Sequence, residues 1–187
     1  MGFERVDDAL VADWEPFEVA LVTSLVGQVN ELLGAARDAE RGDDPFARWE
    51  GEFGPVVELD HDDPVIRRLF PDAYADDPVA SAEHHRYTED QLRRGRIADG
   101  RTVVADVAAT REGTIPLVVA EGHVEAWVRT LNGVRLSLAV RLGVETDADL
   151  SDLARLPARD PRSQLVSLYD WLAWVLESLL DAGADAD

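Results

Sequence analysis

Apolar residues recur every three or four positions along much of the chain, which is the spacing that places them on one face of an α-helix. The longest stripes run through residues 121–142 and 161–181, where leucine, valine and tryptophan alternate with polar residues. Gly95 lies between two further stripes, and we expect it to separate them into two helices because glycine weakens a helix interior. The pattern predicts helices over residues 16–37, 64–70, 78–94, 97–109, 121–142 and 161–181.

Strand-like patterns are short and few. Residues 3–13 alternate apolar and polar positions about Asp7 and Asp8, which predicts a β-hairpin. The apolar run 115–120 predicts a third short strand that could pair with this hairpin. Residues 38–63 hold no sustained periodicity and are expected to form a loop, and residues 182–187 a frayed tail. The whole pattern predicts a single mainly α domain over 1–187, a bundle of five to six helices with a small N-terminal β-hairpin.

Acid–proline pairs stand where three of these helices begin. Asp63–Pro64, Asp77–Pro78 and Asp160–Pro161 each offer a carboxylate that can cap the first turn and a proline that fits its first position. Calcium or magnesium binding is the alternative use of such acids. Capping explains both the acid and the proline, so we favour it and expect no metal site.

The amino-acid composition excludes several kinds of catalytic and binding site. The 187 residues include 38 acidic and 18 basic side chains, a formal net charge of −20, and no cysteine. Every basic residue is arginine, so the lysine of a phosphate-binding loop is absent, and thiolate metal sites and cysteine nucleophiles are excluded. The N-terminal residues do not resemble a signal peptide and no apolar run approaches the roughly 20 residues of a membrane span, so a cytoplasmic location is expected.

No catalytic pattern accompanies this composition. The serine motifs of hydrolases and the zinc-binding HExxH pattern are both absent. We therefore expect neither enzyme activity nor a cofactor. A charge of −20 also repels phosphate backbones and anionic membranes, so direct DNA contact would need a local basic patch.

One segment concentrates arginine and is the candidate for such a patch. It includes Arg86, Arg93, Arg94, Arg96 and Arg101. With the expected helix break at Gly95, the segment loosely resembles a helix-turn-helix, and the strand 115–120 could act as a wing. A solvated helix face is the alternative interpretation, and the more common one.

Polar side chains also interrupt the stripes of the last two long helices. We expect Arg135 to pair with Asp170 across these helices, with Asn132 or Tyr169 completing a buried network, because buried polar groups need partners. A ligand pocket that includes Arg135 and Trp171 is the alternative.

The ordered segments RLFPDAY, TEDQLR, LNGVRL and YDWLAW, together with the helices that carry them, resemble the actinobacterial AosR-like family, formerly a domain of unknown function. The resemblance runs from about residue 3 to residue 181. It implies a cytoplasmic transcriptional regulator linked to oxidative stress, with no catalytic residues to transfer. Since this chain has no cysteine, it cannot carry a thiol switch itself.

Three hypotheses follow for the function. The first is a non-enzymatic regulator that acts through a protein partner, a sigma factor or RNA polymerase, more than through DNA. The second is an enzyme or ligand-binding domain with a pocket between the last two helices. The third is an adaptor without a gene-regulatory role. A homodimer is compatible with each of them.

Overall fold

The computed structural model of the protein describes residues 2–35, 59–71, 78–157 and 159–184. Within these ranges it contains six helices: α1 (Pro16–Leu32), α4 (Pro64–Leu69), α5 (Pro78–Ala109), α6 (Glu121–Leu142), α7 (Asp147–Leu153) and α8 (Arg162–Ala184). Three strands, β1 (Glu4–Val6), β2 (Ala9–Ala12) and β3 (Leu117–Ala120), form one antiparallel sheet in the order β1-β2-β3. The prediction of a mainly helical fold with a small N-terminal hairpin is confirmed, and the third strand pairs with the hairpin.

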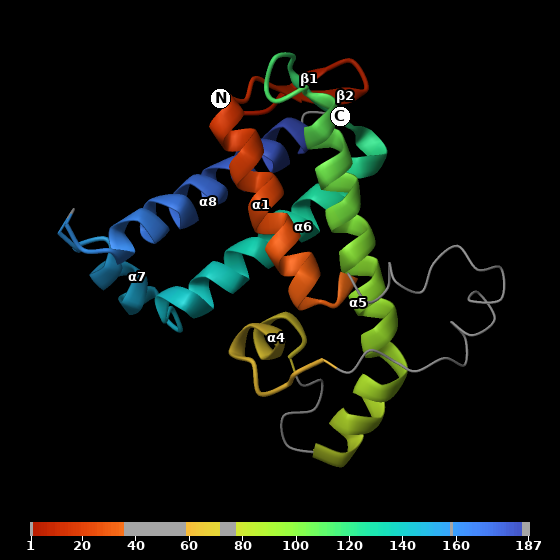
Figure 1. The fold of residues 1–187 in the computed structure, drawn as a ribbon, viewed down its shortest axis with the longest axis vertical. Helices are drawn as coiled ribbons and strands as arrows, with labels where there is room; N and C mark the ends of the chain where they lie inside the picture. The colour runs from red at the N-terminus through yellow and green to blue at the C-terminus, as the bar shows by residue number, and fades with distance from the viewer. Residues whose placement is uncertain (1, 36–58, 72–77, 158, 185–187) are drawn as a thin grey trace.

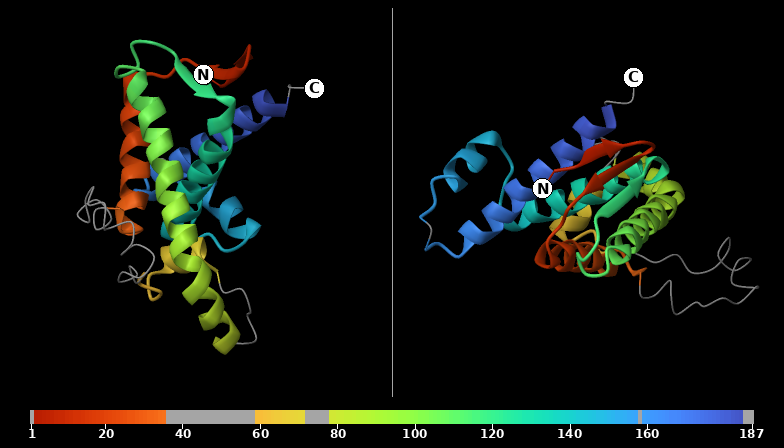
Figure 2. Two further views of the ribbon diagram at one scale, coloured as in Figure 1. Left: turned by 90° about the vertical axis from the view of Figure 1, so that its right-hand side faces the viewer. Right: turned by 90° about the horizontal axis from the view of Figure 1, so that it is seen from above.

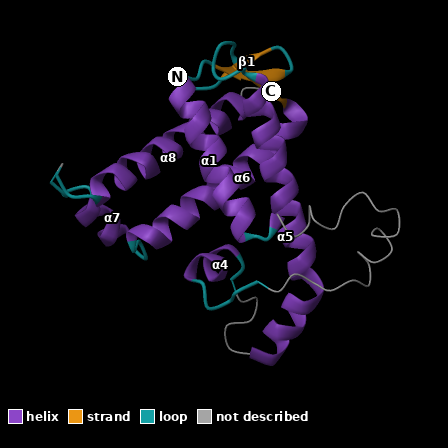
Figure 3. Cartoon of the chain, viewed as in Figure 1, coloured by secondary structure: helices purple, strands orange, loops and turns teal. Residues whose placement is uncertain are grey.

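The four long helices form the body of the molecule. Helices α1 and α5 lie side by side, α6 packs against both of them, and α8 packs along α6 (Figure 1). The sheet covers one end of this body, where α1 begins, α5 ends and both chain termini lie (Figure 2). The strands of the described residues all lie at that end (Figure 3).

Alternate residues of β2 and β3 are buried towards the helices, as the pleat of a β-strand requires. Asp7 has a φ of 52°, in the left-handed region that tight hairpin turns use. Leu10 of β2 stands opposite Val119 of β3, and both side chains are buried. The inner face of the sheet therefore closes the end of the helical core.

Aromatic side chains fill the core beneath the sheet. Trp127 of α6 is fully buried, and its ring meets those of Phe3 and Trp14 edge-on at 5.9 and 5.6 Å. Trp171 of α8 reaches the same cluster, with 6.0 Å between its ring and that of Trp14. A second, smaller apolar cluster lies under α4 and includes Ile66 and Ile97.

Several helix ends follow their sequence signals. The Asp63 carboxylate accepts a hydrogen bond of 2.7 Å from the backbone N–H of Val65, which confirms the predicted cap of α4. Gly143 ends α6 in the left-handed conformation, with a φ of 73°. Asp77 lies outside the described residues, as does most of the loop predicted over residues 38–63.

The predicted break at Gly95 is wrong. Helix α5 runs without interruption through this position, so there is no helix-turn-helix there. Glycine costs a helix about 1 kcal/mol relative to alanine, and contacts with the rest of the fold readily exceed that cost. The side chains of Arg93 and Ile97, on either side of Gly95, are both buried in the interior.

Other boundaries also differ from the prediction. Helix α1, predicted over residues 16–37, ends at Leu32. Helix α7 was not predicted, although Thr146 and Asp149 form a reciprocal capping box at its start. The predicted tail is helical as far as Ala184, and Arg5 donates hydrogen bonds to the carbonyls of Ala182 and Gly183. These bonds tie the end of α8 to the sheet, while residues 185–187 lie outside the described part.

Candidate functional site

Arg93, at the centre of the predicted basic patch, is an interior residue. Its side chain is 0% exposed, and its Nη1 donates a hydrogen bond of 3.0 Å to the carbonyl of Leu33 at the end of α1. Its Nε and Nη2 donate to Asp90 Oδ1 at 3.2 and 2.9 Å. A guanidinium enclosed in this way does not reach the surface where a DNA phosphate would bind.

Arg96 also turns inward. Its Nη2 donates a hydrogen bond of 3.1 Å to the carbonyl of Leu69, the last residue of α4, and its guanidinium lies 5.4 Å from the centre of the Phe70 ring. Burial lowers the pKa of Arg96, while the nearby Asp99 acts in the opposite direction. The two bonds to helix-terminal carbonyls make Arg93 and Arg96 a clamp that holds α1 and α4 against α5.

The remaining members of the predicted patch do not rebuild it. Arg94 is half exposed and forms an ion pair of 2.7 Å with Asp90, and Arg101 is exposed. The Arg86 side chain lies outside the described part of the structure. The structure therefore divides the predicted patch between the interior and the surface of α5.

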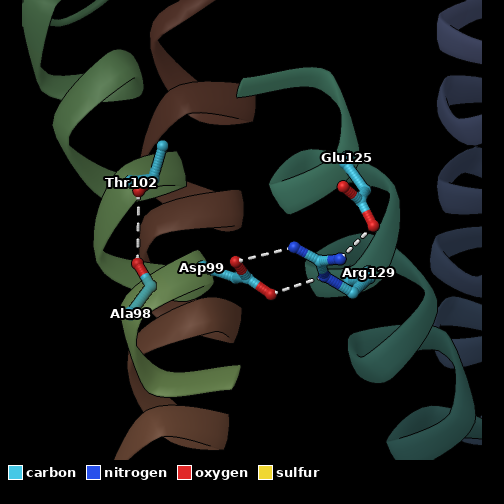
Figure 4. Close-up of polar contacts among 5 residues, drawn as sticks. All are labelled: Ala98, Asp99, Thr102, Glu125 and Arg129. Carbon is cyan, nitrogen blue, oxygen red and sulfur yellow. Dashed lines mark hydrogen bonds and ion pairs between the residues drawn. The ribbon is translucent and has the colours of Figure 1, made fainter. Parts of the chain in front are cut away.

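A second polar group joins α5 to α6 beside the clamp. Arg129 of α6 holds Asp99 of α5 through two bonds, from Nε at 2.7 Å and from Nη2 at 3.2 Å, and also pairs with Glu125 (Figure 4). The bond to Asp99 is the largest contribution to the raised pKa of Arg129. The Thr102 hydroxyl, one turn along α5, donates to the carbonyl of Ala98 instead and takes no part in the bridge.

A small pocket opens where α1, α4, α5 and α6 meet, next to these arginines. Its volume is about 20 Å³, and Asn30, Arg96, Thr130 and Gly133 are among the residues that line it. A water molecule needs roughly 10–15 Å³ on this scale, so the pocket has room for about one. The buried hydroxyl of Thr130 has no hydrogen-bond partner among the residues that the structure describes, and such a water would satisfy it. A metabolite would not fit.

The predicted polar network between the last two helices does not form. The Arg135 guanidinium lies over the Tyr169 ring, 4.8 Å from its centre, instead of pairing with a carboxylate. Asp170 and Asn132 are exposed, so the helix faces that carry them look outward. Trp171 packs against Trp14 in the core. The structure thus replaces the predicted ion pair with a cation–π contact.

A carboxylate of α5, that of Asp106, contacts two polar side chains of α6. Asp106 Oδ2 accepts a hydrogen bond of 2.8 Å from Trp127 Nε1, and both carboxylate oxygens lie 3.0 Å from His123 Nδ1. His123 and Trp127 stand four residues apart on one face of α6, which the sequence shows. That Asp106 of α5 would meet them is a tertiary contact, for which the sequence carries no local signal.

The described residues hold no group of three or more histidine, aspartate or glutamate side chains placed to bind a metal ion. None of the helices in that same part of the chain is both long enough and apolar enough to cross a membrane.

The sequence is similar to known proteins and matches one family model. The chain is 29% identical over 181 residues to the oxidative stress regulator AosR of Mycobacterium tuberculosis (strain ATCC 25618 / H37Rv), and equally to that of Mycobacterium bovis. The match covers 88% of this chain and 78% of each relative. No solved structure matches the fold. The family model DUF2017, described as a domain of unknown function, matches residues 1–183, and the chain therefore belongs to this family.

Proposed function

We propose that this protein is a non-enzymatic transcriptional regulator linked to oxidative stress, acting in the cytoplasm through a protein partner, a sigma factor or RNA polymerase. The observation that carries the proposal is the similarity to proteins named oxidative stress regulator over 88% of the chain. A likeness spread over nearly the whole length favours a shared role of the complete fold.

The distribution of charge supports a protein partner over DNA. The chain carries a net charge of −20, which opposes approach to a phosphate backbone. Two of the five arginines that could have offset this charge locally, Arg93 and Arg96, bond to carbonyls inside the fold. An acidic surface is instead complementary to a basic protein surface and accelerates its encounter.

The oxidant signal must then come from outside this chain. Cysteine is absent and Met1 is the sole methionine, so the two side chains that oxidants modify most readily are nearly missing. We assign the chain the role of an effector that responds to a modified or newly available partner.

In vitro transcription tests the proposal. RNA polymerase core, each purified sigma factor and promoters of oxidant-induced genes are combined with and without the protein, and DNA binding by the protein alone is followed by fluorescence anisotropy. We expect transcript levels to change with one holoenzyme, and no saturable DNA binding at low or physiological salt. Tight DNA binding that falls steeply with salt would contradict the partner mechanism. Unchanged transcription with every holoenzyme would contradict the regulatory role.

A further inference from the structure

The start of α1 and the loop that leads from α5 into β3 lie at the sheet-bearing end of the molecule (Figures 1 and 2). Residues of both segments line a groove. Its volume is about 340 Å³, within the roughly 300–1,000 Å³ range of binding pockets. We call it the head groove. It is lined by Asp13, Trp14, Glu15, Phe17, Glu18, Gly113, Thr114, Ile115 and Pro116.

The walls of the head groove expose large apolar side chains. Phe17 is 66% exposed, the most of any large apolar residue described, and Ile115 on the opposite wall is 45% exposed. The outer face of the sheet at the same end is also apolar in part, since Val118 of β3 is 54% exposed and stands opposite Val11 of β2. The outer face of a small antiparallel sheet usually carries polar residues, so this surface is suited to a partner.

The rim of the same groove is acidic. Asp13, Glu15 and Glu18 are among its lining residues, and the lining includes no basic side chain. Glu18 is buried and its Oε2 accepts a hydrogen bond of 2.7 Å from the Glu15 N–H, so Asp13 and Glu15 supply the exposed carboxylates. Other exposed acids lie on the strands, turns and loops of this end: Glu4, Asp7, Asp8, Glu112 and Glu121. Arg5, on β1, is directed to the carbonyls at the end of α8, whereas Arg111, beside Glu112 in the loop from α5 to β3, is exposed. The head groove therefore combines apolar anchoring surface with an excess of exposed acidic side chains around it.

Backbone contacts fix the conformation of the loop that forms one wall of the groove. Gly113, with a φ of 78°, packs closely on the residues that lead into α1. A Cβ at this position would lie 2.8 Å from the carbonyl oxygen of Trp14. The buried Thr110 hydroxyl accepts a hydrogen bond from the Gly113 N–H. Arg111 and Glu112 both have positive φ, at 51° and 61°, a conformation that non-glycine residues keep only where the surroundings enforce it. A preformed site loses less conformational entropy on binding.

We propose that the head groove is the docking site for a segment of a partner protein that presents a bulky apolar side chain flanked by arginine or lysine. The apolar side chain would lie between Phe17 and Ile115, and the cations would face the carboxylates of the rim. A second copy of this chain is the wrong occupant, since it would bring an equally acidic surface. The inference rests on the proposed function only in that it locates the partner contact which that function requires.

A synthetic peptide tests the site without knowledge of the natural partner. The probe is a short dye-labelled peptide in which arginine and leucine alternate, and its affinity for the full chain is measured by fluorescence anisotropy at physiological salt. The double variant F17S/I115S removes the apolar walls and leaves the charge unchanged. The matched control is L92S, because Leu92 on α5 is 55% exposed and lies far along that helix from the groove.

We expect F17S/I115S to weaken binding of the peptide at least about tenfold, the scale of losing an anchor residue, and L92S to leave it unchanged. E15Q should weaken binding less and reduce its salt dependence. Equal affinity of F17S/I115S and wild type would overturn the proposal, because the peptide would then be held by overall charge alone. So would an absence of saturable binding to the wild-type chain.

The same variants separate this inference from the proposed function. If the wild-type chain alters transcription and F17S/I115S is equally active, the docking site is wrong and the regulatory role stands. If the peptide binds in the head groove and no holoenzyme responds to the wild-type chain, the docking site stands and the regulatory role fails.

Discussion

Replacing the buried arginine of α5 tests the interpretation of the arginine segment most directly. R93A removes a side chain that is 0% exposed and leaves the Leu33 carbonyl and the Asp90 carboxylate without its three hydrogen bonds. Breaking a buried ion pair costs about 3–5 kcal/mol. Asp90 is 22% exposed and keeps its bond to Arg94, so we expect the lower end, about 3 kcal/mol.

R94A is the matched control for this change. Arg94 follows Arg93 directly and bonds the same carboxylate, at 2.7 Å, but its side chain is 45% exposed. Exposed ion pairs contribute about 0–1 kcal/mol, so R94A should be nearly neutral. The comparison sets the buried contacts of Arg93, including its bond to the Leu33 carbonyl, against an exposed ion pair of the same residue type on the same helix and with the same acidic partner.

Urea unfolding followed by far-UV circular dichroism measures both variants. The midpoint should fall for R93A with little change in slope, and a loss of about 3 kcal/mol should lower the melting temperature by about 6–12 °C in a chain of this size. Equal stability of R93A and R94A would refute the clamp. Arg93 would then be available for another role, including the DNA contact predicted from the sequence.

Three further predictions concern backbone and caps. G95A should stabilise the protein by about 0.5–1 kcal/mol in urea unfolding, because Gly95 lies in the interior of α5 with open space around it; destabilisation would speak against a continuous helix there. G113A should destabilise the protein more than G143A. Both residues have positive φ, but of the two only residue 113 would place a Cβ against a backbone oxygen. Equal losses of stability in urea unfolding would contradict that packing. Hydrogen bonds from the backbone N–H groups of Glu145 and Thr146 lower the pKa of Asp149 below its ordinary value of 3.8, so its capping contribution is present above that pH and is lost as the pH falls through the lower folded-state pKa. Wild type should therefore exceed D149N in stability at neutral pH, with the difference vanishing in acid, and a difference that does not change with pH would contradict the cap.

Local signals in the sequence predicted the fold well where they act alone. The heptad-like stripes located α1, α6 and α8, and the Asp63–Pro64 pair located the start of α4. Gly95 does not break α5, because its helix penalty of about 1 kcal/mol is smaller than the stabilisation from the buried residues on either side of it. Helix α7 is short and weakly apolar, so its capping box was the available signal, and aspartate stands there in place of the more familiar glutamate.

The polar contacts were harder to predict because they depend on tertiary geometry. Arg135 was expected to find a carboxylate and instead stacks on the neighbouring aromatic ring of Tyr169. A single residue of rotation along α8 separates Tyr169 from Asp170, which is about 100° on a helix. The sequence shows which polar residues adjoin an apolar stripe, and only the packing of α6 on α8 decides which of them face each other.

The placement of arginine connects the stability of this fold to the charge of its surface. Arginine is the one cation in the chain, and its planar fork is suited to buried carbonyls and carboxylates. Arg93 and Arg96 both bond to carbonyls at the C-terminal ends of other helices, where the helix dipole favours positive charge. Each cation used in this way is removed from the surface, which increases the excess of exposed carboxylates. The same arginines that hold α1 and α4 on α5 are thus unavailable to offset the exposed carboxylates, and this loss of surface cations supports our proposal of a basic protein partner in place of a nucleic acid.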